Sequence, residues 1–213
     1  MTSAVHTRGA TLAAAVTALA CASVLLAGCG GSTAAVVGSP TGQSWRSSLS
    51  ADERSQATAA LVKRSQLPEL SSSTKPVSIS DLAADADLAD LPATLARLGY
   101  RGGVQRVFRG ASSSVTSADS RVLVFGSADD ATGYTTYVHD HAGAFFGDPT
   151  VVTAWPASGP ASWQFTPPLC ACHRAEPLYA AVVQDGATVR WLQINGPTAS
   201  ARQVRTLLSA PAG

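Results

Sequence analysis

Hydrophobic and polar positions divide the chain into three parts of different character. The first, residues 11–28, is an uncharged apolar run that follows a short start containing Arg8. The second, residues 29–48, is rich in Gly, Ser and Thr and shows no periodicity, which is typical of a flexible linker. In the third, residues 49–213, apolar residues recur at helix and strand periods, so we expect one folded domain there.

Capping residues and helical spacing predict four helices in this domain. Ser50 and Glu53 form a capping-box pair that indicates the first helix, while Ser127 and Thr198 have side chains that cap two others. Apolar residues recur three or four positions apart, which gives each helix one buried face. We expect the helices over residues 50–66, 88–98 and 127–145, and from residue 198 onward. The side chains expected on the buried faces of the last three helices are Leu88, Leu91, Leu95, Leu98, Ala131, Tyr134, Val138, His141, Phe145, Ala201, Val204 and Leu208.

Short apolar runs predict six strands. The run VLVF at residues 122–125 is apolar on both faces, so its strand is expected to lie inside the sheet. The pair Asp185-Gly186 lies between two apolar runs and predicts a type I′ hairpin that places Val182 opposite Val189. The strands are expected over residues 103–109, 120–125, 151–155, 162–165, 178–184 and 187–194.

The order of these elements, with hairpin-length connections in the second half, predicts an α+β domain. Its sheet is expected to be mostly antiparallel, with the helices packed on one face. The chain shows no internal repeat at the periods of solenoids or propellers, which favours a single domain of this kind.

The apolar run near the start of the chain ends in a distinctive four-residue motif. A positively charged start, an apolar stretch and small residues at its end are the parts of a secretory signal peptide. Leu26-Ala27-Gly28-Cys29 resembles the lipobox of bacterial lipoproteins. The resemblance implies a diacylglycerol group on Cys29, removal of residues 1–28, and a mature chain held on the outer face of the cytoplasmic membrane. An uncleaved membrane anchor is the alternative, which the Ala- and Thr-rich composition of the run disfavours.

The region that follows the lipobox is electrically balanced. Arg8 is the only charged side chain before Cys29, so the remainder has equal numbers of basic and acidic side chains. Binding to nucleic acid depends on neutralising phosphates, which argues against nucleic acid as a partner. In architecture this region is similar to small uncharacterised lipoproteins of high-GC Gram-positive bacteria, a resemblance that assigns no catalytic residue.

Three sulfur and imidazole side chains lie close together in the stretch LCACHRAE. Cys170, Cys172 and His173 are residue types that bind Cu(I) or Zn(II), so a small metal site is one interpretation. The C-x-C spacing is shorter than that of most zinc sites. Because thiols oxidise outside the membrane, a disulfide between Cys170 and Cys172 is favoured, with two reduced thiols or redox exchange as further alternatives. His139 and His141 lie about 200° apart on their helix and do not converge on one ion.

None of the common catalytic motifs is present. The chain has no G-x-S-x-G elbow, no phosphate-binding loop and no H-E-x-x-H pair. Four aspartates between Asp81 and Asp90 lack the spacing of a calcium loop and are interpreted as a solvated acidic segment. Four arginines between Arg97 and Arg109 are interpreted as a solvated basic rim.

Together these features predict a membrane-anchored cell-envelope lipoprotein that acts as a binding or interaction module. Its expected partners are the membrane, through the lipid anchor, and an envelope protein, a lipid or a wall component. No cofactor is expected beyond the acyl anchor on Cys29, and no catalytic residue is predicted. The alternative is a metal-handling or thiol-redox protein that acts through Cys170, Cys172 and His173. A hydrolase is a third hypothesis, which would need a deep pocket with a convergent histidine and carboxylate.

Overall fold

A computed structural model of the chain describes residues 48–110, 114–147, 151–154, 162–166 and 178–209. Helices and strands alternate irregularly along these residues, as expected for an α+β fold. The helices are α1 (Ala51–Ala59), the 3₁₀ helix η1 (Arg64–Gln66), α2 (Ile79–Asp85), α3 (Leu91–Arg97), α4 (Ala128–Asp140), α5 (Ala142–Phe146) and α6 (Ala201–Ser209). The strands are β1 (Ser71–Val77), β2 (Gly102–Arg109), β3 (Ser117–Val124), β4 (Val151–Ala154), β5 (Trp163–Thr166), β6 (Leu178–Asp185) and β7 (Thr188–Asn195).

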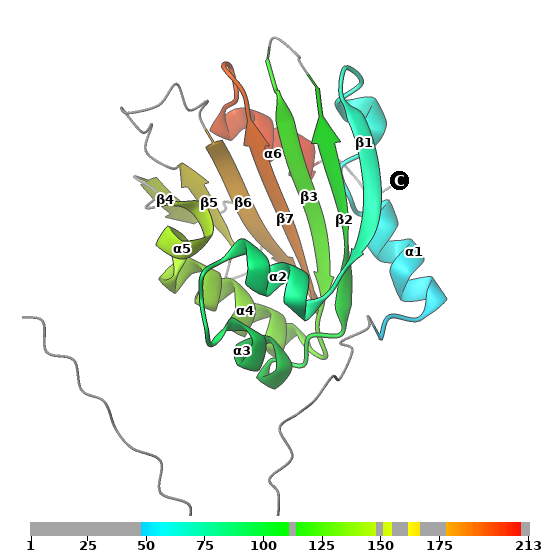
Figure 1. Ribbon diagram of the computed structural model, residues 1–213, viewed down its shortest axis with the longest axis vertical. Coiled ribbons are helices and arrows are strands. Elements are labelled where there is room, and N and C mark those ends of the chain that lie inside the picture. Colours follow the sequence, from blue (N-terminus) through cyan, green and yellow to red (C-terminus); the bar gives the residue numbers. More distant parts are fainter. Residues whose placement is uncertain (1–47, 111–113, 148–150, 155–161, 167–177, 210–213) are drawn as a thin grey trace, which may run out of the picture. The chain divides into compact units, whose positions relative to one another are not determined.

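The strands join into one sheet in the order β1-β2-β3-β7-β6-β5-β4, with β7 at its centre (Figure 1). Every pair of neighbouring strands in the described part of the chain is antiparallel. The predicted α+β class with an antiparallel sheet is therefore confirmed. The strand that contains VLVF lies between β2 and β7, which confirms its expected interior position.

Helices cover both faces of the sheet, whereas the sequence led us to expect them on one face. In Figure 1, α2, α3, α4 and α5 lie in front of the sheet and α6 lies behind it. Leu123 of β3 belongs to the apolar core beneath the front helices, while its neighbour Val122 points to the opposite face and packs in the core beside α1. In β7, Trp191 likewise belongs to the core beneath the front helices, and its neighbour Leu192 belongs to a core on the opposite face. Two layers of helices follow because the central strands are apolar at successive positions and must be covered on both sides.

The starts of α1 and α4 were predicted better than their ends, since the helix expected over residues 127–145 is divided into α4 and α5. Ser50 and Ser127 cap α1 and α4 as expected, each accepting a hydrogen bond from the amide three residues later. The first helix ends at Ala59 rather than near residue 66, and beyond it the Val62 amide donates to the buried Ser120 hydroxyl at 3.0 Å. At this point the Val62 amide therefore donates to a side chain of β3 instead of to a carbonyl oxygen of the helix.

The cap of the last helix also differs from the prediction. The Gln203 amide donates to Ser200 Oγ at 3.2 Å, so Ser200 takes the capping position expected for Thr198. The buried face of α6 contains Val204 and Leu208 as predicted. Its start is displaced by only two residues, a typical uncertainty at helix ends.

The β6–β7 hairpin forms where the sequence predicted it, with a different register. Its two turn residues are Gly186 and Ala187, and Gly186 has a φ of 56°, a conformation that favours glycine. Val182 therefore pairs with Trp191 rather than Val189. Because the register differs by two positions, the same side chains still face the core, and the predicted core face of the hairpin is confirmed.

Strand β1 was not predicted, because its sequence SSSTKPV contains almost no apolar residue. Six of its seven residues are exposed, and it pairs only with β2 at the edge of the sheet. Lys75 and Pro76 are residue types that protect sheet edges from further pairing. Only Val77, at the end of the strand, enters the apolar core.

Candidate functional site

The residues that the sequence singled out for lipidation, disulfide formation or metal binding lie outside the described residues. They are Cys29, Cys170, Cys172 and His173. The lipid anchor, the disulfide and the metal site, like the signal peptide and linker over residues 1–28 and 29–48, therefore stay predictions. Within the described part of the chain, no group of three or more His, Cys, Asp or Glu side chains is placed to hold a metal ion. No helix in that part is long and apolar enough to cross a membrane.

The two histidines of the described chain each pack against a separate aromatic ring. His139 lies 4.0 Å from Trp163, measured between ring centroids. His141 stacks on Tyr137 at 4.1 Å, and its Nδ1 lies 2.9 Å from the Tyr137 carbonyl oxygen. Both are partly buried. The prediction that they act as packed residues is consistent with these contacts.

The acidic segment is more structured than the sequence suggested. Asp81 accepts hydrogen bonds from the backbone and hydroxyl of Ser78 and closes a capping box at the start of α2. Asp90 accepts from the Tyr137 hydroxyl at 2.9 Å. Burial, with this hydrogen bond, raises the pKa of Tyr137 to about 12. Asp85 points in another direction and pairs with a buried arginine described below.

The four arginines of the expected basic rim are dispersed over the fold. Arg101 pairs with Glu53 of α1. Arg106 donates to the Val62 carbonyl oxygen at 2.8 Å and so ties β2 to the segment after α1. Arg109 lines the cavity described below. Arg101 and Arg106 are therefore engaged by partners within the fold, which the interpretation as a solvated rim did not include.

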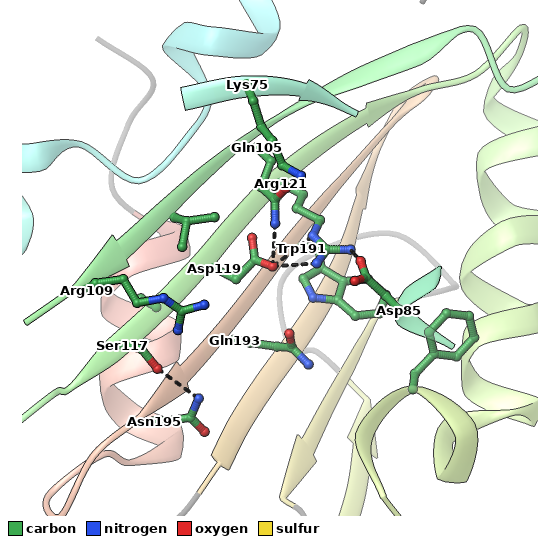
Figure 2. Close-up of a pocket in the computed structure, with 13 residues that line it drawn as sticks. Lys75, Asp85, Gln105, Arg109, Ser117, Asp119, Arg121, Trp191, Gln193 and Asn195 are labelled. Atoms are coloured by element: carbon green, nitrogen blue, oxygen red, sulfur yellow. Dashed lines mark hydrogen bonds and ion pairs between the residues drawn. The ribbon is translucent and has the colours of Figure 1, made fainter. Parts of the chain in front are cut away.

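A polar cavity of about 410 Å³ opens on the front face of the sheet, over β1, β2, β3 and β7 (Figure 2). We call this cavity the groove. The strand register arranges most of its side chains in three rows that run across β2, β3 and β7, at positions two residues apart along each strand. The rows are Gln105–Arg121–Trp191, Val107–Asp119–Gln193 and Arg109–Ser117–Asn195. Asp85 of α2 and Phe145 of α5 border the groove on the side of the helices, and Lys75 of β1 borders it at the sheet edge.

Arg121 is the central charge of the groove, and its side chain is only 7% exposed. Its guanidinium pairs with the carboxylates of Asp119 and Asp85 and lies 5.7 Å from the centre of the Trp191 ring. Burial acts to lower the pKa of Arg121, but the hydrogen bonds and charges of Asp119 and Asp85 outweigh burial and raise it. Arg121 is therefore a permanent cation shared by two carboxylates.

Among the described residues, only one of the two carboxylate oxygens of Asp119 accepts hydrogen bonds. Its Oδ2 accepts from Gln105 Nε2 at 2.7 Å and from Arg121 Nε at 3.0 Å (Figure 2). Its Oδ1 is buried and has no hydrogen-bond partner among the described residues. An ionised carboxylate oxygen can only accept hydrogen bonds, so Oδ1 is an unused acceptor on the groove wall. Leaving such an atom buried without a partner costs about 1–3 kcal/mol, which a bound donor would recover.

A second unpartnered atom lies on the same wall and has the opposite hydrogen-bonding character. Trp191 is 3% exposed, and its indole Nε1 has no acceptor in the described part of the protein. Figure 2 shows the nitrogen-bearing edge of the indole turned toward Gln193 and Asp119. The groove thus presents one buried acceptor and one buried donor that the described protein leaves unsatisfied.

The outer row of the groove adds exposed polar groups. Asn195 Nδ2 donates to Ser117 Oγ at 3.1 Å, which leaves the amide oxygen of Asn195 and the hydroxyl proton of Ser117 for other partners. Arg109 is exposed and forms no ion pair within the described residues. Its side chain extends toward Ser117 and Asp119 in Figure 2.

Sequence reasoning missed the groove, although a signal for it is present. Polar residues occupy alternate positions in β3, at Ser117, Asp119 and Arg121, which places them on one face. The same alternation of polar groups, at Gln193 and Asn195, occurs in β7. Neither pattern shows by itself that the two polar faces meet, because the pairing of β3 with β7 joins residues far apart in the chain.

Comparison with known proteins identifies no family for this chain. No protein-family model matches it, and no curated protein matches it. Among solved structures, it is similar to the extracellular domain of PknH from Mycobacterium tuberculosis, with a TM-score of 0.49 and 12% sequence identity. The similarity covers 73% of this chain and 92% of that one. A TM-score below 0.5 does not establish a common fold, and the proposals below depend on this chain's own residues.

Proposed function

We propose that this protein is a lipid-anchored binding protein of the cell envelope, whose domain holds a small polar ligand in the groove. The observation that carries the proposal is the groove wall itself. A buried Arg121 is held between Asp119 and Asp85, and beside it one acceptor, Asp119 Oδ1, and one donor, Trp191 Nε1, are unsatisfied within the described protein. Binding sites combine a shaped cavity with a few oriented polar groups, and these atoms meet that description.

The lining of the groove supports binding more than catalysis. The described lining residues include no histidine and no cysteine, the side chains that most often transfer protons or attack substrates. Both lining carboxylates, Asp85 and Asp119, are paired with Arg121. The hydrolase hypothesis required a histidine that converges with a carboxylate, and the described groove does not supply one.

The location is proposed from the sequence. The lipobox ending at Cys29 supports acylation of that residue, and two acyl chains would supply membrane affinity on the order of 20 kcal/mol. We expect labelled palmitate to enter the wild-type chain in a host that processes lipoproteins, and the Cys29→Ser chain to stay unlabelled at its unprocessed size. Equal labelling of both chains would contradict the proposed anchor.

Binding in the groove is tested through the Trp191 indole N–H. The chain has four tryptophans, so the ¹⁵N–¹H indole region of the detergent-purified full chain is simple, and loss of one peak in Trp191→Phe assigns Trp191. The probes represent envelope chemistries: N-acetylglucosamine, glycerol 3-phosphate, inositol and alanine. We expect at least one probe to shift the Trp191 peak with saturation, and Arg109→Gln to weaken that response.

Arg97→Gln is the matched control, because Arg97 is an exposed arginine in the last turn of α3 and does not line the groove. It should leave the response unchanged. The proposal that the groove is a ligand site would be wrong if no probe shifted the Trp191 peak. It would also be wrong if Arg97→Gln weakened the response as much as Arg109→Gln.

A further inference from the structure

We infer that the ligand of the groove is a zwitterion of the α-amino acid class, with its ammonium group at Asp119 and its carboxylate at Arg109. This inference deepens the proposed function, on which it rests, by naming the ligand class of the same groove. It is based on the charges of the groove, the two unsatisfied atoms and the spacing of the strand rows.

The inner end of the groove has an uncompensated negative charge. Arg121 contributes one positive charge, while Asp119 and Asp85 contribute two negative charges. All the hydrogen bonds of the Asp119 carboxylate that the structure shows fall on Oδ2. An ammonium group at Oδ1 would therefore satisfy the unused acceptor and bring this cluster to neutrality, through a charge-assisted hydrogen bond.

The outer end of the groove has the opposite charge. Arg109 lies on β2 opposite Ser117, one row away from Asp119, and has no carboxylate partner among the described residues. Lys75, the third cation that lines the groove besides Arg121 and Arg109, pairs with Asp81. A guanidinium without a partner is well suited to bind a carboxylate through two parallel hydrogen bonds.

The spacing of the rows matches an α-amino acid. Adjacent rows on one sheet face are about 6.8 Å apart, since each strand residue rises about 3.4 Å. The ammonium nitrogen and carboxylate oxygens of an α-amino acid lie about 3 Å apart, because bonds of about 1.5 Å join them through one carbon. With a hydrogen bond of about 2.9 Å at each end, such a group spans about 7–9 Å. The rows set the backbone positions, and the Arg109 side chain extends toward Asp119 in Figure 2, so we infer that such a group bridges the two.

The remaining groups suit the rest of such a molecule. Trp191 lies in the row on the far side of Asp119 from Arg109, so its Nε1 can donate to an acceptor of the ligand other than the carboxylate at Arg109, and Gln193 pairs directly opposite Asp119 on β7. A cavity of about 410 Å³ leaves room for a side chain beyond the α-carbon.

Other ligand classes fit the same atoms less well. A simple anion would leave Asp119 Oδ1 without a donor, and a simple cation would leave Arg109 without an acceptor. A neutral sugar would need an exposed aromatic face, but Trp191 is 3% exposed and Arg121 lies over its ring. Each of these classes gives a distinct result in the test that follows.

The test compares three related probes on the full chain in detergent, with the Trp191 indole peak as the readout. Alanine has both charges, alaninamide has only the ammonium, and propionate has only the carboxylate. We expect alanine to saturate the shift at a concentration at least about tenfold lower than either partial analogue, because each analogue lacks one charge-assisted contact. Arg109→Gln should abolish the preference of alanine over alaninamide, and Asp119→Asn should abolish its preference over propionate.

Arg97→Gln again serves as the control and should retain both preferences. The indole spectrum of the unliganded Asp119→Asn variant shows whether its folding is disturbed. If it is, Arg109→Gln, which changes an exposed residue, still tests the carboxylate end of the groove. If propionate or alaninamide bound as tightly as alanine, the inference of a zwitterionic ligand would be wrong, but the groove would still be a ligand site. The same conclusion would follow if N-acetylglucosamine or inositol shifted the Trp191 peak and alanine did not. If none of the probes shifts the Trp191 peak, the zwitterion and the proposed function both fail.

Discussion

The front face of the sheet has an apolar half and a polar half, built from the same strands. In the apolar half, Val77 pairs with Gly103, Gly103 with Leu123, and Leu123 with Val189, and the front helices cover this row. Two, four and six residues further along β2, β3 and β7, the three rows of the groove replace it. The alternation of side chains is identical in both halves. Only the residue types differ, and they decide whether helices cover the sheet or a cavity remains open to a ligand.

This difference separates stability from function within one surface. The apolar half gains free energy by removing side chains from water, at roughly 25 cal/mol per Å² of buried apolar area. The polar half contains a buried guanidinium held between two carboxylates, an arrangement that brings little net stability and is typical of functional sites. Mutations in the two halves should therefore have different consequences.

The largest expected effect compares two aliphatic residues on adjacent strands, one in each half. Leu123 is fully buried beneath the front helices, while Val107 of the groove is only partly buried. We expect Leu123→Ala to lower the free energy of unfolding by about 3 kcal/mol, because it leaves a cavity in the core. Val107→Ala should cost less than about 1 kcal/mol. Urea unfolding followed by circular dichroism measures both, and equal losses would contradict the division into two halves.

A smaller effect is expected from removing the central cation of the groove. Arg121→Met should lower the free energy of unfolding by about 2–3 kcal/mol, because it leaves Asp119 beside the core without its partner. Lys75→Met is the control, since the Lys75–Asp81 pair is exposed and should contribute at most about 0.5 kcal/mol. Thermal unfolding of both variants at one pH makes the comparison. A loss in Arg121→Met no greater than in Lys75→Met would show that the buried network does not support the fold.

The smallest effect concerns α2, the helix that brings Asp85 to the groove. Hydrogen bonds from the Ser78 side chain and backbone, together with the charge of Lys75, lower the pKa of Asp81. Since the folded-state pKa lies below the unfolded value of about 3.9, Asp81 stabilises the fold above that pH and loses this contribution as the pH falls through the lower folded value. The stability difference between wild type and Asp81→Asn should therefore shrink between about pH 6 and about pH 3.

Because the Asp81 side chain is 39% exposed and its charge is screened by solvent, we expect that difference to be a few tenths of a kcal/mol at neutral pH. Ser78→Ala removes the hydroxyl that donates to Asp81 and should reduce the pH dependence in the same range. A difference that stays constant with pH would mean that Asp81 acts only through its shape.

Much of the fold is predictable from local patterns. The capping serine of α4 with its buried residues Ala131, Tyr134 and Val138, the position of the β6–β7 hairpin and the interior place of β3 all follow from residues close together in the chain. His141 and Phe145, expected on the same stripe, lie beyond the end of α4 and are only partly buried.

The candidate site is different. Asp119 and Arg121 are recognisable as polar residues in a strand, but their partners Gln105, Asp85 and Trp191 come from other elements.

What the sequence by itself determined is the class of the fold and most of its elements; the proposed location depends on the resemblance of residues 26–29 to a lipobox. Tertiary structure alone decided that helices cover both faces, that the polar segment before Val77 pairs as an edge strand, and that three polar rows form a groove. The physical reason is that capping, turns and periodicity act over a few residues, whereas strand pairing joins distant ones. Val122 and Leu123 indicate two buried faces, but which helices cover each face depends on the packing of the whole chain.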